Sequence, residues 1–345
     1  MSEIKKRFVY VSIVCGVLLS LFSCVSTQGT QVAPEWISSP DAVYPSADYL
    51  NGVGAGSTKK DAENEALSYL LRGIVQSVNS VVKTEKTLQG NDTVGYNTDY
   101  AYDFSVESSS SLRDIPGISF PEVWVAPNGT YYVLAQLNRN ATGKFFQERV
   151  SNLSKIVESE IVYADKEKNT LKALRALKNA KEKAYENKEN LTALAGINFT
   201  MYRMVANDYI SPETVEVLLN RTAESIPISV TVQGDSQGRI KSGLLSGLEQ
   251  AGLKSIRQDS TDGYVLEAVI SMEDVESSTK YSYVRYVIDI TLTDLKNQEV
   301  VFALSDNGRE AHMSSSEARQ RAYRTIESFI EKEFVQRFSD YIENL

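Results

Sequence analysis

A strand that runs straight into a capped helix is written in one stretch, Tyr49-Leu50-Asn51-Gly52-Val53-Gly54-Ala55-Gly56-Ser57-Thr58-Lys59-Lys60-Asp61-Ala62. Ser57 or Thr58 can cap a helix, because a side-chain oxygen accepts a hydrogen bond from the free N–H groups of the first turn. Asp61 suits the positive end of the helix dipole. The glycines give the backbone freedom at the turn. We therefore expect a strand–turn–helix unit here.

An apolar stripe continues from this cap. Its members recur every four residues: Ala62, Ala66, Leu70, Ile74, Val78 and Val82. Residues spaced in this way lie on one face of a helix, so the stripe predicts an amphipathic helix of about 25 residues.

Two further patterns complete the first predicted domain. Aromatic and apolar residues alternate with polar ones from Tyr100 to Glu107, which is typical of a half-buried strand. Pro127-Asn128-Gly129 separates two more such segments and predicts a hairpin turn. The order strand, helix, strand, hairpin indicates an α+β sandwich over residues 34–140.

The glycine-rich run from Gly52 to Gly56 also invites a nucleotide-binding interpretation. Its spacing is G-x-G-x-G, whereas the dinucleotide fingerprint is G-x-G-x-x-G, and no P-loop Lys-Ser/Thr follows it. We therefore attribute the glycines to the turn and expect no cofactor.

Residues 141–225 are rich in Lys, Glu, Ala and Leu. Apolar residues at helical spacing run from Phe145 to Ile161 and again from Leu171 to Ala184. Two such helices with a short connection predict a helical hairpin. It can serve as a spacer or brace, or as a partner-binding helical repeat.

The last predicted domain covers residues 226–345 and reads β-α-β-β-β-α. Its expected strands are Ile228–Val232, Tyr264–Ile270, Tyr283–Thr293 and Val300–Leu304. Gly252 is expected to stop the first helix. Ser314-Ser315-Ser316-Glu317 is a capping-box pattern at the start of the second. The fold class predicted for the whole chain is α+β, with two α/β-sandwich-like domains joined by a helical hairpin.

The N-terminus reads as an export signal. Lys5-Lys6-Arg7 precedes an apolar run from Phe8 to Phe22, which ends at Ser23-Cys24. The run is shorter than the roughly 18–20 residues that a spanning helix needs. Leu21-Phe22-Ser23-Cys24 resembles the lipobox of bacterial lipoproteins, in which the cysteine is lipidated. An ordinary cleaved signal with an incidental cysteine, or a retained membrane anchor, are the alternatives.

Cysteine usage favours lipidation. The chain has two cysteines, and Cys15 would be removed with a signal peptide of residues 1–23. Cys24 would then be the single thiol of the mature protein, at the head of a polar tether of residues 24–33. Two acyl chains give stable membrane attachment, whereas one gives reversible binding. Because no Asp follows Cys24, we expect the outer membrane, on its periplasmic or surface face.

Composition and histidine count exclude several classes of function. The chain has 345 residues with a formal net charge of -9, which argues against nucleic-acid binding. His312 is the only histidine, so neither a pair of histidine metal ligands nor a triad without His312 is possible. We expect no catalytic residue and no metal.

Two resemblances point to the bacterial envelope. Pro34-Glu35-Trp36-Ile37, the run Tyr49–Gly56 and the Ala-rich helix from Ala62 resemble the LPP20 family of envelope lipoproteins. This implies a lipoprotein with no catalytic residues to carry over. The β-α-β-β-β-α order of the last domain is similar to the amino-terminal domain of TolB and to related domains such as that of the curli-secretion channel protein.

Three functions remain open. The first is a non-enzymatic, lipid-anchored module that binds envelope proteins. The second is an accessory component of an assembly or secretion machine that oligomerises through the last domain. The third is a cryptic hydrolase of the periplasm, which would need a polar cleft with a perturbed carboxylate.

Overall fold

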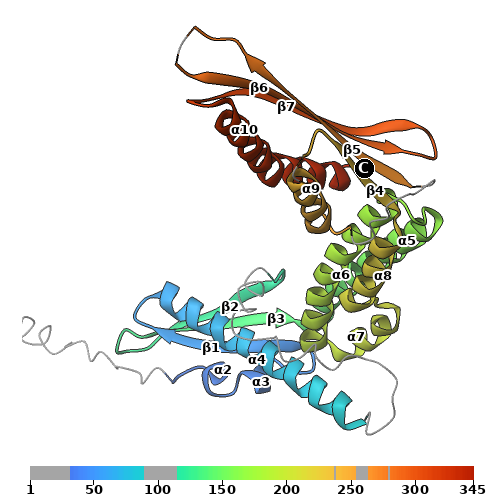
Figure 1. Ribbon diagram of the computed structural model, residues 1–345. Helices are drawn as coiled ribbons and strands as arrows, with labels where there is room; N and C mark the ends of the chain where they lie inside the picture. The colour runs from blue at the N-terminus through green and yellow to red at the C-terminus, as the bar shows by residue number, and fades with distance from the viewer. Residues whose placement is uncertain (1–31, 89–114, 237, 254–262, 279) are drawn as a thin grey trace, which may run out of the picture. The chain divides into compact units, whose positions relative to one another are not determined.

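The computed structural model describes residues 32–88, 115–236, 238–253, 263–278 and 280–345 (Figure 1). These residues form two compact units. Unit 1 comprises the described residues up to Gly73 and those from 115 to Arg139, and unit 2 comprises the others. Each unit combines helices with one sheet, which confirms the predicted α+β class. The expected signal peptide lies outside the described residues.

The sheet of unit 1 has the strand order β1-β3-β2, with antiparallel pairing throughout. Strand β1 spans Tyr49–Gly56, β2 spans Ile118–Val125 and β3 spans Tyr131–Asn138. Two short helices, α2 (Glu35–Ser38) and α3 (Pro40–Val43), precede β1. The central strand β3 carries the core of the sheet, and its buried apolar residues are Val133, Leu134, Ala135 and Leu137.

Helix α4 spans Lys59–Leu88 and begins where the sequence predicts. Thr58 Oγ1 accepts a hydrogen bond from the backbone N–H of Asp61 at 3.2 Å, which caps the first turn. The predicted stripe is confirmed as far as it is described, with buried side chains at Ala62, Ala66, Leu70, Ile74 and Val78. The side chain of Val82 lies outside the described part of the structure. At 30 residues the helix is longer than expected.

The predicted hairpin turn is also confirmed. The backbone N–H of Ala126 donates to Thr130 O at 2.8 Å, and that of Gly129 donates to Ala126 O at 2.8 Å. Gly129 has a φ of 85°, a conformation that glycine adopts without strain. The strand expected over Tyr100–Glu107 lies outside the described residues.

Unit 2 includes the second half of α4, from Ile74 onwards. It continues with helices α5 (Arg139–Lys166), α6 (Leu171–Ile197), α7 (Phe199–Val205) and α8 (Pro212–Ser225). Hydrogen bonds between α5 and α6 join Arg149 with Glu186, Ser154 with Asn187, and Glu160 with Asn179. Arg149 and Ser154 pair with residues 186 and 187, whereas Glu160, further along α5, pairs with the earlier residue Asn179, so the two helices are antiparallel, as predicted. Helix α6 continues to Ile197, well beyond the predicted apolar segment.

The second sheet has the order β4-β5-β6-β7. Its strands are β4 (Ile228–Gln233), β5 (Tyr264–Val275), β6 (Ser282–Asp294) and β7 (Glu299–His312). Strand β4 is parallel to β5, and the other pairs are antiparallel. Helix α9 (Arg239–Gln250) follows β4. After β7 the chain forms α10 (Ser315–Phe329), a π-helical turn (Ile330–Phe334) and α11 (Val335–Glu343).

Two predicted helix signals hold in this sheet domain. Gly252 has a φ of 95°, and the N–H of Leu253 donates to Leu248 O at 2.9 Å, so α9 ends as expected. Ser314 Oγ accepts from the backbone N–H of Glu317 at 3.3 Å and caps α10. The predicted β-α-β-β-β-α order is therefore present, with strand β7 much longer than expected.

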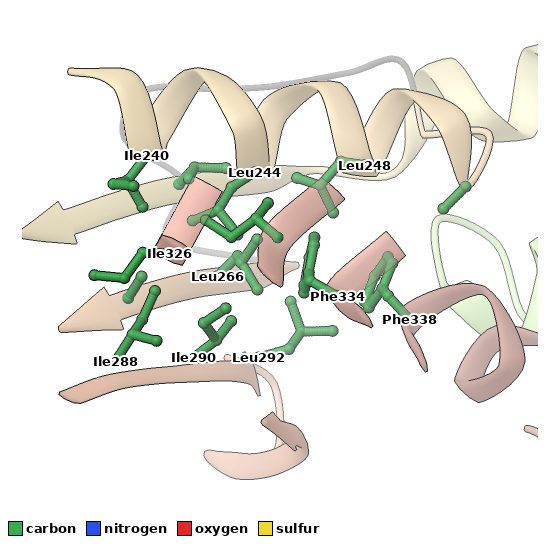
Figure 2. Close-up of a cluster of buried hydrophobic side chains, with 14 of the residues drawn as sticks. Ile240, Leu244, Leu248, Leu266, Ile288, Ile290, Leu292, Ile326, Phe334 and Phe338 are labelled. Atoms are coloured by element: carbon green, nitrogen blue, oxygen red, sulfur yellow. The ribbon is translucent and has the colours of Figure 1, made fainter. Parts of the chain in front are cut away.

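The helices that follow β4 and β7 lie along one face of this sheet (Figure 1). Figure 2 shows the core between them, where side chains of α9 meet those of the strands and of the closing helices. The residues labelled there are Ile240, Leu244, Leu248, Leu266, Ile288, Ile290, Leu292, Ile326, Phe334 and Phe338. All ten are fully buried, so apolar burial on this one face holds the sheet to its helices.

Helix α6 contributes to the same core. Leu171 and Leu174 belong to the buried cluster, and the backbone N–H of Leu171 donates to Tyr264 Oη at 3.3 Å. Lys178 Nζ donates to the backbone oxygen of Ala251, at the end of α9, at 2.9 Å. Burial lowers the pKa of Lys178. The expected helical region (141–225) and last domain (226–345) thus share a core, and their exact limits, like that of the first domain (34–140), remain predictions.

Candidate functional site

The predicted attachment residue, Cys24, lies outside the described residues, as does most of the tether of residues 24–33. Its lipidation therefore stays a prediction. Within the described part of the chain, no helix is long and apolar enough to cross a membrane.

The glycines of β1 have a different role from the one predicted. Gly52, Gly54 and Gly56 all lack a positive φ, so backbone freedom is not the reason for them. A Cβ at Gly52 would lie 2.6 Å from the backbone nitrogen of Leu70 and 2.9 Å from its Cβ. The glycines permit close approach between β1 and α4, and this packing accounts for the G-x-G-x-G pattern.

His312 is the last residue of β7, opposite Ser282 of β6, and is half buried. Its Nδ1 has no hydrogen-bond partner among the described residues. Within the same residues no group of three His, Cys, Asp or Glu side chains could hold a metal ion. Two neighbouring acidic residues, Asp165 in the last turn of α5 and Glu167 just after it, lie on the surface, and Asp165 forms an exposed ion pair with Lys168 at 2.9 Å.

Unit 2 carries a groove of about 480 Å³ beside strand β7. We call it the β7 groove. One wall is the strand segment Phe302–Asp306, and the other is formed by Phe329, Glu333 and Arg337. These three residues are spaced by four, so they form one row along the closing helices.

Phe302, which lines the β7 groove, belongs to an aromatic cluster. The ring of Phe302 contacts the rings of Phe334, Phe338 and Tyr341, with centroids 6.2, 5.4 and 5.5 Å apart. Phe334 and Phe338 are fully buried. Edge-to-face aromatic pairs of this kind contribute about 0.5–1.5 kcal/mol beyond their area burial. The strand is therefore firmly held against the helices.

Ser305 and Asp306, which also line the groove, form side-chain hydrogen bonds to the neighbouring strand β6. Tyr286 Oη donates to Asp306 Oδ2 at 3.2 Å, and Ser305 Oγ donates to Asp289 Oδ1 at 2.6 Å. Burial, and then the carboxylate of Asp306, raise the pKa of Tyr286 to about 12. The phenol therefore stays protonated and keeps donating at physiological pH. The ion pair of Glu333 with Arg337 is long, at 3.9 Å, and both side chains are largely exposed.

Sequence reasoning did not find this groove. The apolar run Val300–Leu304 does predict a strand, but nothing in it indicates that the strand forms the edge of the sheet. The row of Phe329, Glu333 and Arg337 was visible only as part of a closing helix. The signal in the sequence was the four-residue spacing of one apolar and two oppositely charged residues, which places them on one face of the helix.

The comparisons with known proteins support a lipoprotein. Residues 34–138 match the model of the LPP20 lipoprotein family. No curated protein matches the chain. The similarity to the TolB amino-terminal domain is not among these findings and stays a prediction.

Several solved structures resemble the chain at low identity. The secreted protein HP1454 from Helicobacter pylori is 15% identical, with a TM-score of 0.40 over 83% of this chain and 98% of that one. A minor lipoprotein from Acinetobacter baumannii is 13% identical, with a TM-score of 0.25 over 34% and 90%. A PelC dodecamer from Paraburkholderia phytofirmans is 18% identical, with a TM-score of 0.22 over 31% of this chain and 80% of that one. With TM-scores below 0.5, these likenesses carry no functional argument.

The family match falls on the domain in which the sequence predicted it, from the Pro-Glu-Trp-Ile segment to the end of β3. It covers less than half of the chain, so it describes that domain. Residues 34–138 form a domain similar to the LPP20 lipoproteins, and this supports a bacterial lipoprotein of unspecified role.

Proposed function

We propose that this chain is a non-enzymatic lipoprotein of the bacterial outer membrane, attached through lipid on Cys24, that acts by binding other envelope proteins. The observation that carries the proposal is the position of the LPP20 match, which begins ten residues after Cys24. That spacing suits a lipidated cysteine, a short tether and a folded domain. A tether of ten residues reaches at most about 36 Å, so the domain would work close to the lipid headgroups.

Metabolic labelling with a palmitate analogue tests the anchor. Wild type and the control Cys15→Ala should carry label, because Cys15 would be removed with the signal peptide. Cys24→Ala should carry none. Equal label on Cys24→Ala, or none on wild type, would overturn the proposal. Density-gradient separation of the two membranes then tests the outer-membrane assignment, which enrichment in the inner membrane would contradict.

The proposal that the chain is not an enzyme and binds proteins rests on the sequence, in which His312 is the only histidine and therefore the only candidate histidine base. Crosslinking in intact cells followed by affinity purification tests the binding role. The expected result is a reproducible set of envelope proteins that is lost when Cys24→Ala releases the chain from the membrane. A purified chain that hydrolyses cell-wall or peptide substrates would contradict it.

A second candidate function is an oligomeric component of an envelope assembly. The β7 groove favours it, because the groove lies on an open strand edge within the domain predicted to oligomerise. The native mass of the chain in detergent tests this function, and a strict monomer would contradict it.

A further inference from the structure

Strand β7 offers an open edge. It is the outermost strand of the order β4-β5-β6-β7 and pairs, among the described strands, with β6 alone. It is 14 residues long. An edge strand presents a row of backbone N–H and C=O groups that can pair with another strand. Natural proteins commonly block such an edge with charged residues, bulges or proline. Strand β7 has charged residues near its two ends and a register shift in its pairing with β6, but its segment from Val300 to Ser305 carries no charge and no proline.

The groove next to this edge has room for an added strand. Ala303 and Ser305 are small, exposed residues on β7. On the opposite face of the strand, Phe302 and Leu304 point towards the helices, and Phe329, Glu333 and Arg337 line the groove from the helix side. A strand that pairs with β7 would therefore place its own side chains, or those of a helix packed on it, against the row of Phe329, Glu333 and Arg337.

The row is self-complementary. Glu333 and Arg337 have opposite charges, one helical turn apart, with side chains 58% and 66% exposed. Their mutual distance of 3.9 Å is at the limit of an ion pair, so both charges remain available. If a two-fold axis passes between these positions, each Glu333 faces Arg337 of a second copy. Two equivalent ion pairs then form across the axis.

Strand and helix agree on this arrangement. The closing helices run antiparallel to β7, since Thr325 donates to Glu310 near one end and Phe338 packs on Phe302 near the other. A two-fold axis perpendicular to the sheet would therefore make both the two β7 strands and the two helices antiparallel. In this arrangement the two β7 strands lie about 4.8 Å apart. The closing helices of the two copies lie on the same face of the joined sheet, where packed helix axes are about 8–10 Å from each other.

We propose that the β7 groove is the docking face for a second copy of this chain, with the two β7 strands paired antiparallel about a two-fold axis and Glu333 of each copy paired with Arg337 of the other. Such an interface joins two four-stranded sheets into one continuous sheet and removes both open edges. It is isologous, which is the commonest form of association between identical subunits. The inference rests on the oligomeric candidate function and is independent of the lipid anchor.

Charge reversal tests the arrangement on the full-length lipidated chain, purified in detergent and analysed by native mass spectrometry and sedimentation. Wild type should be a dimer. Glu333→Arg places two arginines against each other, and Arg337→Glu places two glutamates together. Each single variant should weaken the dimer by about ten-fold or more, because a like-charge pair at an interface costs more than a kcal/mol.

The double variant Glu333→Arg with Arg337→Glu restores opposite charges across the axis, and its dimer should recover. Lys332→Glu, an exposed charge reversal at a residue outside the groove, is the matched control and should leave the dimer unchanged. Far-UV circular dichroism checks that each variant is folded.

A monomeric wild type would overturn the inference, whatever the palmitate labelling shows. Single variants that remain dimeric would overturn the role of the groove. Loss of the dimer in the single variants without recovery in the double variant would overturn the two-fold arrangement and point to a different docking partner.

Discussion

Gly308 of β7 lies directly opposite Tyr286 of β6, and the tyrosine ring occupies the space that a side chain at position 308 would need. A Cβ on Gly308 would lie 2.6 Å from Tyr286 Oη and 2.7 Å from Cε1. Tyr286 is only 4% exposed, and Asp306, two residues before the glycine, accepts its hydroxyl hydrogen bond. Glycine weakens a strand, and here the aromatic ring across the ladder covers the gap.

Gly308→Ala should therefore destabilise unit 2 by about 1–3 kcal/mol, because the added methyl group displaces a buried ring and its hydrogen bond. Urea unfolding followed by far-UV circular dichroism measures the effect. The matched control is Gly243→Ala in α9, where a Cβ would be 3.4 Å from Ile330 Cγ2, an ordinary contact. That control should be neutral or stabilising by up to about 1 kcal/mol. Equal losses in the two variants would contradict the packing argument.

The same pair shows why the sequence predicted only part of strand β7. Its first half, Val300–Leu304, is a continuous apolar run and was predicted from the sequence. The second half, Ser305-Asp306-Asn307-Gly308-Arg309, has the composition of a turn. It is a strand because β6 pairs with it through His312 and because Tyr286 covers its glycine. Both causes are tertiary contacts, which a local pattern does not contain.

Local signals predicted the rest of the fold well. The Thr58 cap, the hairpin turn at Gly129 and the helix end at Gly252 all depend on residues within one turn of each other, so the sequence carries them. The β7 groove was missed for the opposite reason. Its two walls are about 30 residues apart in the chain, and its character depends on which strand lies at the sheet edge.

Tyr286 should also make unit 2 sensitive to alkaline pH. Its pKa is raised from 10.0 to about 12, so the folded state favours the neutral phenol. The stabilisation is complete below pH 10 and is lost as the pH rises towards 12. Between pH 8 and pH 11, wild type should lose about 1.4 kcal/mol more of its free energy of unfolding than Tyr286→Phe, which has no such titration. Urea titrations at both pH values measure this difference, and parallel losses in the two proteins would contradict it.

Gly52→Ala should destabilise unit 1 by about 3 kcal/mol, since its Cβ would lie 2.6 Å from the Leu70 backbone nitrogen, which cannot rotate away. Gly73→Ala is the control. Gly73 lies in helix α4, as Leu70 does, and a Cβ there would meet nothing within 4 Å. It should stabilise by about 0.5–1 kcal/mol. Both tryptophans, Trp36 and Trp124, lie in unit 1, so tryptophan fluorescence during urea unfolding reports on this unit. A Gly52→Ala protein as stable as wild type would refute close approach as the reason for the glycine.

The contact between α5 and α6 gives the last prediction. Asn187 is fully buried, its Nδ2 donates to Ser154 Oγ at 3.0 Å, and its Oδ1 has no hydrogen-bond partner among the described residues. Ser154→Ala removes the one partner of a buried amide and should destabilise by about 1–3 kcal/mol. Replacing both residues, Ser154→Ala with Asn187→Leu, leaves an apolar contact of similar volume and should recover most of that loss. A double-mutant cycle from urea unfolding gives the coupling free energy. A double variant less stable than Ser154→Ala alone would show that Asn187 stabilises the helix pair through contacts other than Ser154.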